Sequence, residues 1–209
     1  MGRIRERAAL VVFGVVALSG LANAQSSTNR PAFGVYAGLN LATISGKDIP
    51  NASNRAGVVV GASLTWQFSD MFGFQPQLEY SQKGVMYSLG NVSVDGTISY
   101  VEVPLLFRVS PSGMQGFTPF LLVGPAVGYK TACNIKGAVG NLSVSSSCAA
   151  LSAKVDDIDY GLMFGAGGDF KVGSLKMTGA VRYDLGLKNL ASDADAKNRV
   201  ISFLVGLRW

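Results

Sequence analysis

Few side chains in this sequence are suited to catalysis. The chain contains no histidine, the residue that most often serves as a general base or metal ligand near neutral pH. Serine–lysine chemistry is left open, although no serine and lysine are predicted to lie together on one face. The sequence therefore predicts no catalytic residue, no cofactor and no enzymatic activity.

Three aspartates lie close together, at Asp156, Asp157 and Asp159. Their oxygens are the ligand type that a divalent cation such as Ca²⁺ prefers. The alternative is that they cap and solubilise the end of a loop. We expect the second role, and no metal site is predicted.

Cys133 and Cys148 are the only cysteines. An even count in an exported chain suggests a disulfide. The bond would staple one long loop, because the residues between the two cysteines are rich in Gly, Ser and Asn. A pair of free thiols is the alternative, and a metal site is disfavoured because the chain offers no histidine and no further cysteine.

Charged residues of both signs recur at alternate positions of otherwise apolar segments. If these segments close into a barrel, the charges point into a narrow interior, where ionisable groups usually persist because they are paired. We interpret them as a salt-bridge network that fills the lumen. The predicted lumen network consists of Glu79, Glu102, Arg108, Asp159, Asp169, Lys176, Arg182, Asp184 and Arg208.

The N-terminal residues 1–24 have the pattern of a secretory signal peptide. Three arginines precede an apolar run over 8–18, and Ala22-Asn23-Ala24 fits the cleavage pattern. The alternative is a membrane anchor, but a spanning helix needs roughly 20 apolar residues. A flexible mature N-terminus over 25–32 is expected to follow.

Removing the signal peptide takes away three Arg and one Glu, which lowers the formal charge from +5 to +3. The remaining basic residues are spread along the chain and form no run. Nucleic acid is therefore excluded as a partner.

Alternation of apolar and polar residues recurs in segments of roughly ten residues, as in membrane β-barrels. Beyond residue 24 no run approaches 18 apolar residues, which excludes helical spans. Eight strands are predicted, over 33–42, 57–68, 72–83, 98–109, 117–130, 158–171, 174–187 and 199–209. The prediction is one all-β domain over 33–209, an eight-stranded antiparallel up-and-down transmembrane β-barrel.

The predicted connections alternate in length. Short ones follow the second, fourth and sixth strands. Long polar ones cover 43–56, 84–97, 131–157 and 188–198. Outer-membrane barrels have short periplasmic turns and longer extracellular loops, so both ends of the barrel domain are expected at the periplasmic side.

Two features favour a membrane barrel over a soluble one, apart from the charges. Glycines crowd the polar face, as a narrow lumen requires. Aromatic residues on the apolar face collect at two depths, as the two membrane interfaces select. The predicted girdle consists of Phe33, Trp66, Phe68, Phe74, Phe107, Phe117, Phe170 and Trp209 near the short-turn end, and Tyr80, Tyr129, Tyr160 and Tyr183 toward the long loops.

Several segments resemble the PorT-like outer-membrane β-barrel proteins. The run ISYVEVPLLFR (98–108) resembles a strand of that family with the pattern Y-(L/V)-x-(I/V)-P-L-L-x-(K/R). Further similar segments are VYAGLN (35–40), LEYSQKG (78–84), DYGLMFGAGG (159–168) and VRYDLGLKN (181–189). The resemblance implies an eight-stranded barrel in a Gram-negative envelope. The closing pattern from Phe203 to Trp209 also resembles the terminal aromatic signal read by the barrel-assembly machinery.

The leading hypothesis is a non-enzymatic integral protein of the outer membrane that acts through its long extracellular loops or as a structural element. Its expected partners are outer-membrane lipid and, during biogenesis, the barrel-assembly machinery. The sequence does not identify an extracellular ligand or protein partner. The alternatives are a small pore, an outer-membrane enzyme acting on envelope lipid, and a soluble periplasmic barrel.

Overall fold

The structure is a computed structural model that describes residues 31–46, 53–89, 92–111, 116–139, 142–150, 155–190 and 196–209. The predicted signal peptide and most of segment 25–32 lie outside the described residues. Among the described residues, none forms a helix long and apolar enough to cross a membrane. The strands are β1 (Ala32–Ser45), β2 (Arg55–Gln67), β3 (Phe72–Leu89), β4 (Val92–Val109), β5 (Phe117–Val139), β6 (Leu142–Ser147), β7 (Ile158–Val172), β8 (Leu175–Gly186) and β9 (Lys197–Arg208).

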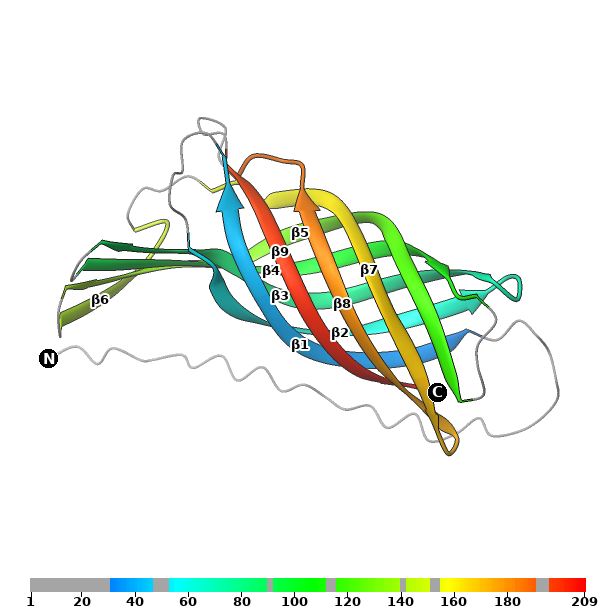
Figure 1. The fold of residues 1–209 in the computed structure, drawn as a ribbon. Helices are drawn as coiled ribbons and strands as arrows, with labels where there is room; N and C mark the ends of the chain where they lie inside the picture. Colours follow the sequence, from blue (N-terminus) through cyan, green and yellow to red (C-terminus); the bar gives the residue numbers. More distant parts are fainter. Residues whose placement is uncertain are drawn as a thin grey trace, which may run out of the picture.

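Eight of these strands form a closed antiparallel ring (Figure 1). The ring runs β1–β2–β3–β4–β5–β7–β8–β9, and β9 pairs with β1 to close it. Phe33 and Trp209 exchange two backbone hydrogen bonds of 3.1 and 3.0 Å, so the ends of the barrel meet at the short-turn end. The predicted eight-stranded barrel is confirmed.

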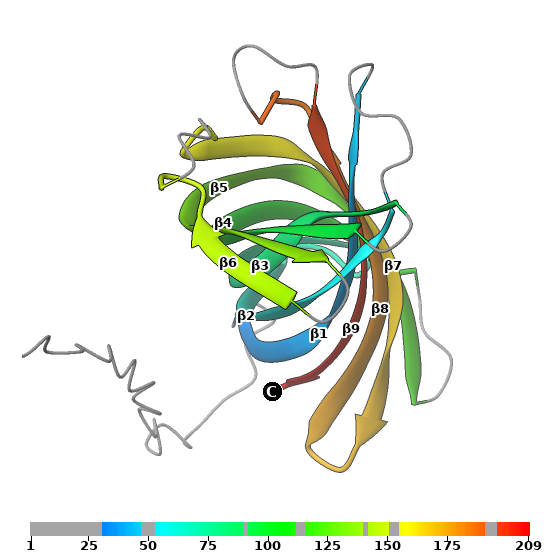
Figure 2. The ribbon, with the colours of Figure 1, turned by 90° about the vertical axis from the view of Figure 1, so that its left-hand side faces the viewer.

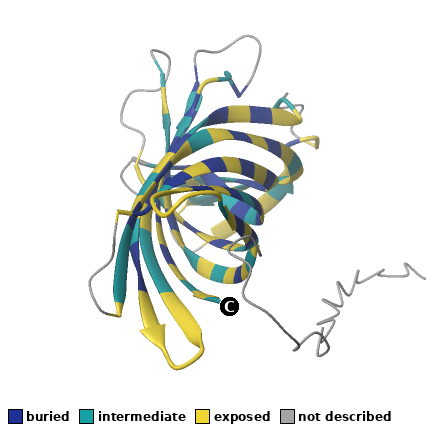
Figure 3. Ribbon diagram, turned by 90° about the vertical axis from the view of Figure 1, so that its right-hand side faces the viewer, coloured by how far each residue is buried: buried dark blue, intermediate teal, exposed yellow. Residues whose placement is uncertain are grey.

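Buried and exposed residues alternate along the strands, as Figure 3 shows. In β4 the outward Val101, Val103 and Leu105 are 40–44% exposed, whereas the inward Glu102 and Leu106 are buried. An apolar outer surface around a partly polar interior is the reverse of a soluble barrel and suits a lipid environment. The aliphatic and β-branched residues that form these strands therefore also form the surface that faces lipid.

The turn between β7 and β8 shows why one end of the barrel has short connections. Val172 pairs directly with Leu175, which leaves only Gly173 and one further residue in the turn. Gly173 has φ +63°, a left-handed conformation that suits a two-residue hairpin and that other residues rarely adopt.

Two of the predicted long loops are wrong. Over 84–97, β3 continues to Leu89 and β4 begins at Val92. Over 131–157, β5 continues to Val139 and an additional strand, β6, pairs back onto it. The Gly and Ser residues that suggested loops lie in these strands. This part of the sheet extends beyond the barrel, so neither of its faces has to be apolar to meet lipid.

These extensions form a four-stranded sheet that projects from the barrel, at the end opposite the C-terminus (Figure 1). We call it the projecting sheet; it consists of 84–89 of β3, 92–97 of β4, 132–139 of β5, and β6. Figure 2 views the molecule from this end, with β6 at the edge of the sheet.

Candidate functional site

The charges in the lumen form three tiers along the barrel axis. In the tier nearest the short turns, Arg108 donates to Asp169 Oδ2 at 2.7 Å and Arg208 donates to the same oxygen. The Thr178 hydroxyl donates to Asp169 Oδ1 at 2.7 Å, and Arg108 also donates to Gln75 Oε1 at 3.0 Å. Two guanidinium groups share one carboxylate, so this tier carries one positive charge in excess.

The middle tier is a balanced ion pair. Arg182 Nη2 lies 2.6 and 2.8 Å from the two carboxylate oxygens of Glu79, and Arg182 Nη1 donates to Gln77 Oε1 at 2.8 Å. The Tyr36 hydroxyl donates to Glu79 Oε2 at 2.6 Å. Arg182 and Glu79 are both buried, and charge-assisted bonds of this kind are the strong ones in proteins.

Two glycines make room for Tyr36 in the lumen wall. Gly61 of β2 and Gly206 of β9 stand opposite Tyr36 on either side. A Cβ atom at Gly61 would lie 2.7 Å from Tyr36 Cζ, and one at Gly206 would lie 3.0 Å from Tyr36 Cβ. The tyrosine ring therefore fills space that its neighbours leave empty.

The upper tier is built around Lys83. Its ammonium group lies 2.7 Å from Glu102 Oε1 and 3.7 Å from Asp159 Oδ2, and it also contacts Asp184 Oδ2. Asn198 donates to Asp159 Oδ2 at 2.7 Å. One cation thus serves three buried carboxylates, so this tier carries two negative charges in excess when all three are ionised.

Apolar side chains fill the rest of the interior. One cluster comprises Leu106, Phe120, Leu122, Ala126 and Met163, contributed by β4, β5 and β7. A second cluster lies near the projecting sheet and contains Ile98, Tyr100 and Leu190, with Ile44, Cys133 and Val155 packed against it. The lumen is therefore occupied by side chains, as in other eight-stranded barrels.

The structure brings together eight of the nine residues predicted for the lumen network. Lys176 differs: its side chain is exposed near the short-turn end of β8, and it has no ion pair with a described residue. Lys83 lies outside the predicted network, because the predicted strand ends at residue 83. The signal was nevertheless present, since Lys83 shares its face with Glu79 and Ser81 at a spacing of two.

The three clustered aspartates do not converge on a common point. Asp156 pairs with Lys188 and Asp157 with Lys130, both at 3.0 Å, while Asp159 points into the lumen. Among the described residues, no group of three or more His, Cys, Asp or Glu side chains is placed to hold a metal ion.

The projecting sheet has one apolar face and one polar face. The apolar face continues the lumen side of the barrel, and its outer part is exposed: Val94, Val139, Leu142 and Val144 are 38%, 59%, 79% and 74% exposed. On the polar face, Asp95 and Lys136 stand opposite each other. Exposed apolar surface of this kind commonly marks a binding site.

The two edges of the projecting sheet differ. On the β3 edge, Ser53 exchanges two backbone hydrogen bonds with Met86, at 2.9 and 3.3 Å, and Arg55 pairs with Asp95 at 2.6 Å. On the β6 edge, no described residue pairs with the outward backbone groups. The described residues therefore cover part of the β3 edge and leave the β6 edge uncovered.

The predicted disulfide between Cys133 and Cys148 is confirmed. It joins β5 to the residue that follows β6, across 15 positions of the chain. Cys148 is buried, and its backbone N–H donates to the Cys133 carbonyl at 3.1 Å. The bond therefore holds β6 against β5 at the base of the projecting sheet.

Reducing this disulfide is expected to loosen β6 and leave the barrel intact. Closing a loop of 15 residues contributes about 3 kcal/mol, and only the projecting sheet depends on this loop. Limited proteolysis should therefore cut the reduced protein within 134–147, while its heat-dependent gel shift stays unchanged. Equal protease resistance of the oxidised and reduced proteins would show that the disulfide does not hold β6.

Aromatic residues lie on the outer face at two depths. At the short-turn end they form ring pairs with centroid distances of 5.0 Å (Phe33–Trp209), 6.5 Å (Trp66–Phe74), 6.0 Å (Phe68–Phe107) and 4.8 Å (Phe117–Phe170). Phe72, which was not predicted, stacks on Phe107 at 5.6 Å. Tyr80, Tyr129, Tyr160 and Tyr183 lie toward the projecting sheet.

Comparison with known proteins gives one family match and several similar structures. The family model described as outer membrane protein beta-barrel domain matches residues 23–192. Neisserial surface protein A (NspA) is 14% identical with a TM-score of 0.50, over 85% of this chain and 97% of that chain. OprG from Pseudomonas aeruginosa is 14% identical with a TM-score of 0.49, over 87% and 97%. No curated protein matches significantly.

Proposed function

The chain belongs to the family of outer membrane protein β-barrel domains and lies in the outer membrane, and on that premise we propose that it is a non-enzymatic barrel that binds extended polypeptide segments outside the cell. Outer-membrane barrels place their longer connections outside, so the projecting sheet is extracellular. The observation that carries the proposal is the edge of β6, which no described residue covers, beside an exposed apolar face.

Backbone hydrogen bonding along β6 is available to a partner strand. The Cys148 N–H donates to the Cys133 carbonyl, and positions that bond across an antiparallel ladder alternate along each strand. The N–H and C=O groups of Ser143 and Ser145 therefore point away from β5, toward the free edge. An extended peptide that adds as a further strand would satisfy them.

The sequence of β6, LSVSSS, lacks the devices that normally protect an edge. Natural edge strands carry charged side chains, proline or bulges that prevent pairing with another chain. β6 has no charge and no proline, whereas the β3 edge of the same sheet is bridged by Ser53, which bonds to Met86. We therefore assign the binding role to the β6 edge.

The apolar face narrows the class of partner. Leu142 and Val144 lie on one face of β6 and the intervening serines on the other. An added strand with apolar residues at alternate positions would extend the apolar face and keep its polar residues on the polar face. Because β6 carries no charge, we expect binding to depend little on salt.

The filled lumen favours this function over a pore, because the side chains of the lumen network and of the two apolar clusters occupy the interior.

Within the family, we propose that the chain is one of the PorT-like barrels, on the similarity of the strand ISYVEVPLLFR. That strand builds the barrel wall, so the placement adds nothing to the choice of partner.

A proline at position 145 tests the proposal. Ser145→Pro removes one N–H group from the free edge and leaves the hydrogen bonds between β5 and β6 in place, because that N–H points away from β5. The probe is a labelled peptide of alternating threonine and valine, bound to the barrel in lipid nanodiscs and followed by fluorescence anisotropy. Affinity should fall by about tenfold or more, which corresponds to ~1.4 kcal/mol.

Ser145→Ala is the matched control, because it removes the hydroxyl and keeps the N–H group. It should bind the peptide as the wild type does. Hydrogen exchange of the β6 amides should slow when the peptide binds to the wild type. If Ser145→Pro and Ser145→Ala bind equally tightly, the β6 edge is not the binding surface.

A further inference from the structure

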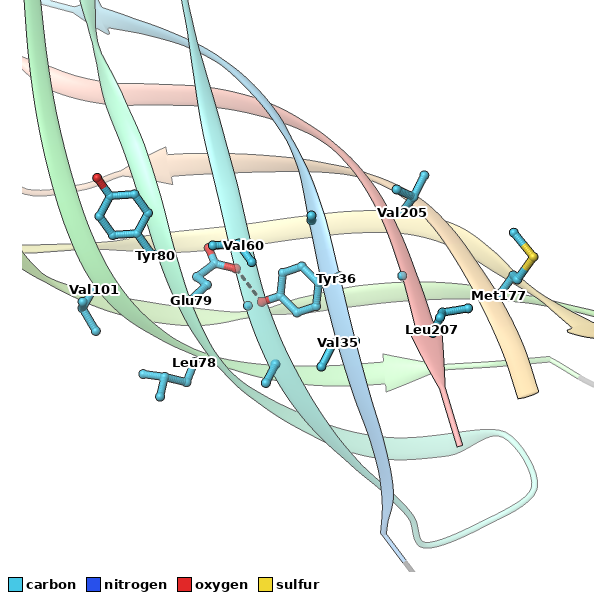
Figure 4. A pocket seen from close by; sticks show the side chains of 14 residues that line it. Val35, Tyr36, Val60, Leu78, Glu79, Tyr80, Val101, Met177, Val205 and Leu207 are labelled. Carbon is cyan, nitrogen blue, oxygen red and sulfur yellow. Dashed lines mark hydrogen bonds between the residues drawn. The ribbon is translucent and has the colours of Figure 1, made fainter. Parts of the chain in front are cut away.

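A groove with a volume of about 750 Å³ crosses the outer, lipid-facing surface of the barrel. Figure 4 shows it across β8, β9 and β1 to β4. One row of outward residues at directly opposed positions lines its length, formed by Met177, Leu207, Val35, Ala62 and Leu78. A barrel wall is convex, so a groove of this size requires a local cause.

Small side chains are that cause. Ala37 and Ala62 occupy outward positions of β1 and β2 at the centre of the groove, where most outward positions carry Val, Leu or aromatic residues. The larger Leu78 and the projecting Val205 form the walls.

The aromatic pair at the short-turn end shows where the groove begins along the membrane normal. Phe33 and Trp209 lie two residues from Val35 and Leu207, which is roughly 7 Å along the strands. Aromatic side chains of this kind sit at the membrane interface, and the short-turn end is periplasmic. The end of the groove formed by Met177, Leu207 and Val35 therefore lies among the acyl chains just inside the periplasmic interface, and the lining continues from there toward Val101 and Tyr80.

The lining offers hydrocarbon and no free polar group. The polar groups along the lining already have partners, since Glu79 is bound by Arg182 and Tyr36 and the Tyr80 hydroxyl donates to Ser99. A second copy of the chain is a poor occupant, because a symmetric dimer would place groove against groove and leave a void between them. A flexible hydrocarbon chain can follow the groove.

We infer that this groove is a binding site for one acyl chain of a phospholipid from the periplasmic leaflet. The site depends on the location of the barrel in the outer membrane and is independent of polypeptide binding by β6. An ordinary lipid-facing surface exchanges its lipids freely, whereas a chain seated in a groove contacts protein on several sides and is retained longer.

The test fills the groove and measures lipid that stays bound. Ala37→Phe adds a ring at its centre, and Ala62→Phe does so independently from β2. Ala166→Phe is the matched control, since Ala166 is an exposed outward alanine of β7 away from the groove. Each protein is purified from its own outer membrane in mild detergent and examined by native mass spectrometry, and heat-dependent gel shift verifies that it is folded.

The wild type and Ala166→Phe should retain a phospholipid, and the two groove variants should retain about tenfold less, or ~1.4 kcal/mol in affinity. Equal retention by the wild type and the groove variants would overturn the proposal, as would no retention by any protein. Retention of lipid A in place of phospholipid would contradict the assignment of the lipid to the periplasmic leaflet. A dimer that Ala37→Phe dissociates would instead assign the groove to a second copy.

Discussion

Replacing Lys83 with methionine is expected to destabilise the folded barrel by ~3–5 kcal/mol or more, because removing one partner of a buried ion pair leaves uncompensated charge in the interior. Here the change strands three carboxylates, those of Glu102, Asp159 and Asp184. Methionine keeps the unbranched chain and removes only the charge and its hydrogen bonds. Urea unfolding in lipid vesicles, read by the fraction that shows the heat-dependent gel shift, gives the change in free energy.

Lys176→Met is the matched control for this prediction. Lys176 is exposed at the end of β8, so its loss should change stability by no more than about 0.5 kcal/mol, as for most surface substitutions. Combining Lys83→Met with Glu102→Gln should recover part of the lost stability, since the two residues share one network. A Lys83→Met protein as stable as Lys176→Met would mean that the upper tier does not hold the barrel together.

The contrast between Lys83 and Lys176 shows what alternation can predict. A period of two assigns each residue to a face, and on that basis both lysines belong to the lumen side. Burial depends on a second quantity, the position along the strand. Lys176 stands where the barrel opens to water, and Lys83 stands inside because β3 continues six residues beyond it, to Leu89. Strand ends are the least reliable part of a sequence-based prediction.

The projecting sheet was missed for a related reason. Within the membrane, the outward residues of β3 are apolar, such as Leu78 and Tyr80. Beyond it, the inward residues are apolar, such as Val85. The polarity of the two faces reverses because the outer side now meets water. A sequence pattern that reverses phase resembles the end of a strand, although β3, β4 and β5 all continue through it, with a β-bulge between Ser99 and Tyr100 in the β4–β5 ladder.

The reversal can be used as a marker of the membrane boundary. In β3 it falls between Tyr80 and Val85, and in β4 between Ile98, which is buried on the inner side, and the outward Val101. Lys83 lies at this level and pairs across the barrel with Asp184 of β8. The most charged tier of the lumen is thus placed where the lipid ends, and the second apolar cluster separates it from water above.

The middle tier gives the second large effect, because Arg182 binds both carboxylate oxygens of Glu79. Arg182→Met should cost ~3–5 kcal/mol, as expected when a buried carboxylate loses its cation. Tyr36→Phe removes one hydrogen bond to the same carboxylate and should cost less, about 1.5–3 kcal/mol. The same urea titration orders the two variants.

The double variant Glu79→Gln with Arg182→Met separates the ion pair from simple loss of packing. With the carboxylate neutralised, no charge is left stranded, so the double variant should be more stable than Arg182→Met alone. A balanced pair allows this recovery in one step, whereas the upper tier would need more than one neutralisation. If the two changes add without recovery, Arg182 supports the barrel through its packing and its bond to Gln77, and the balanced charge of the middle tier contributes nothing measurable.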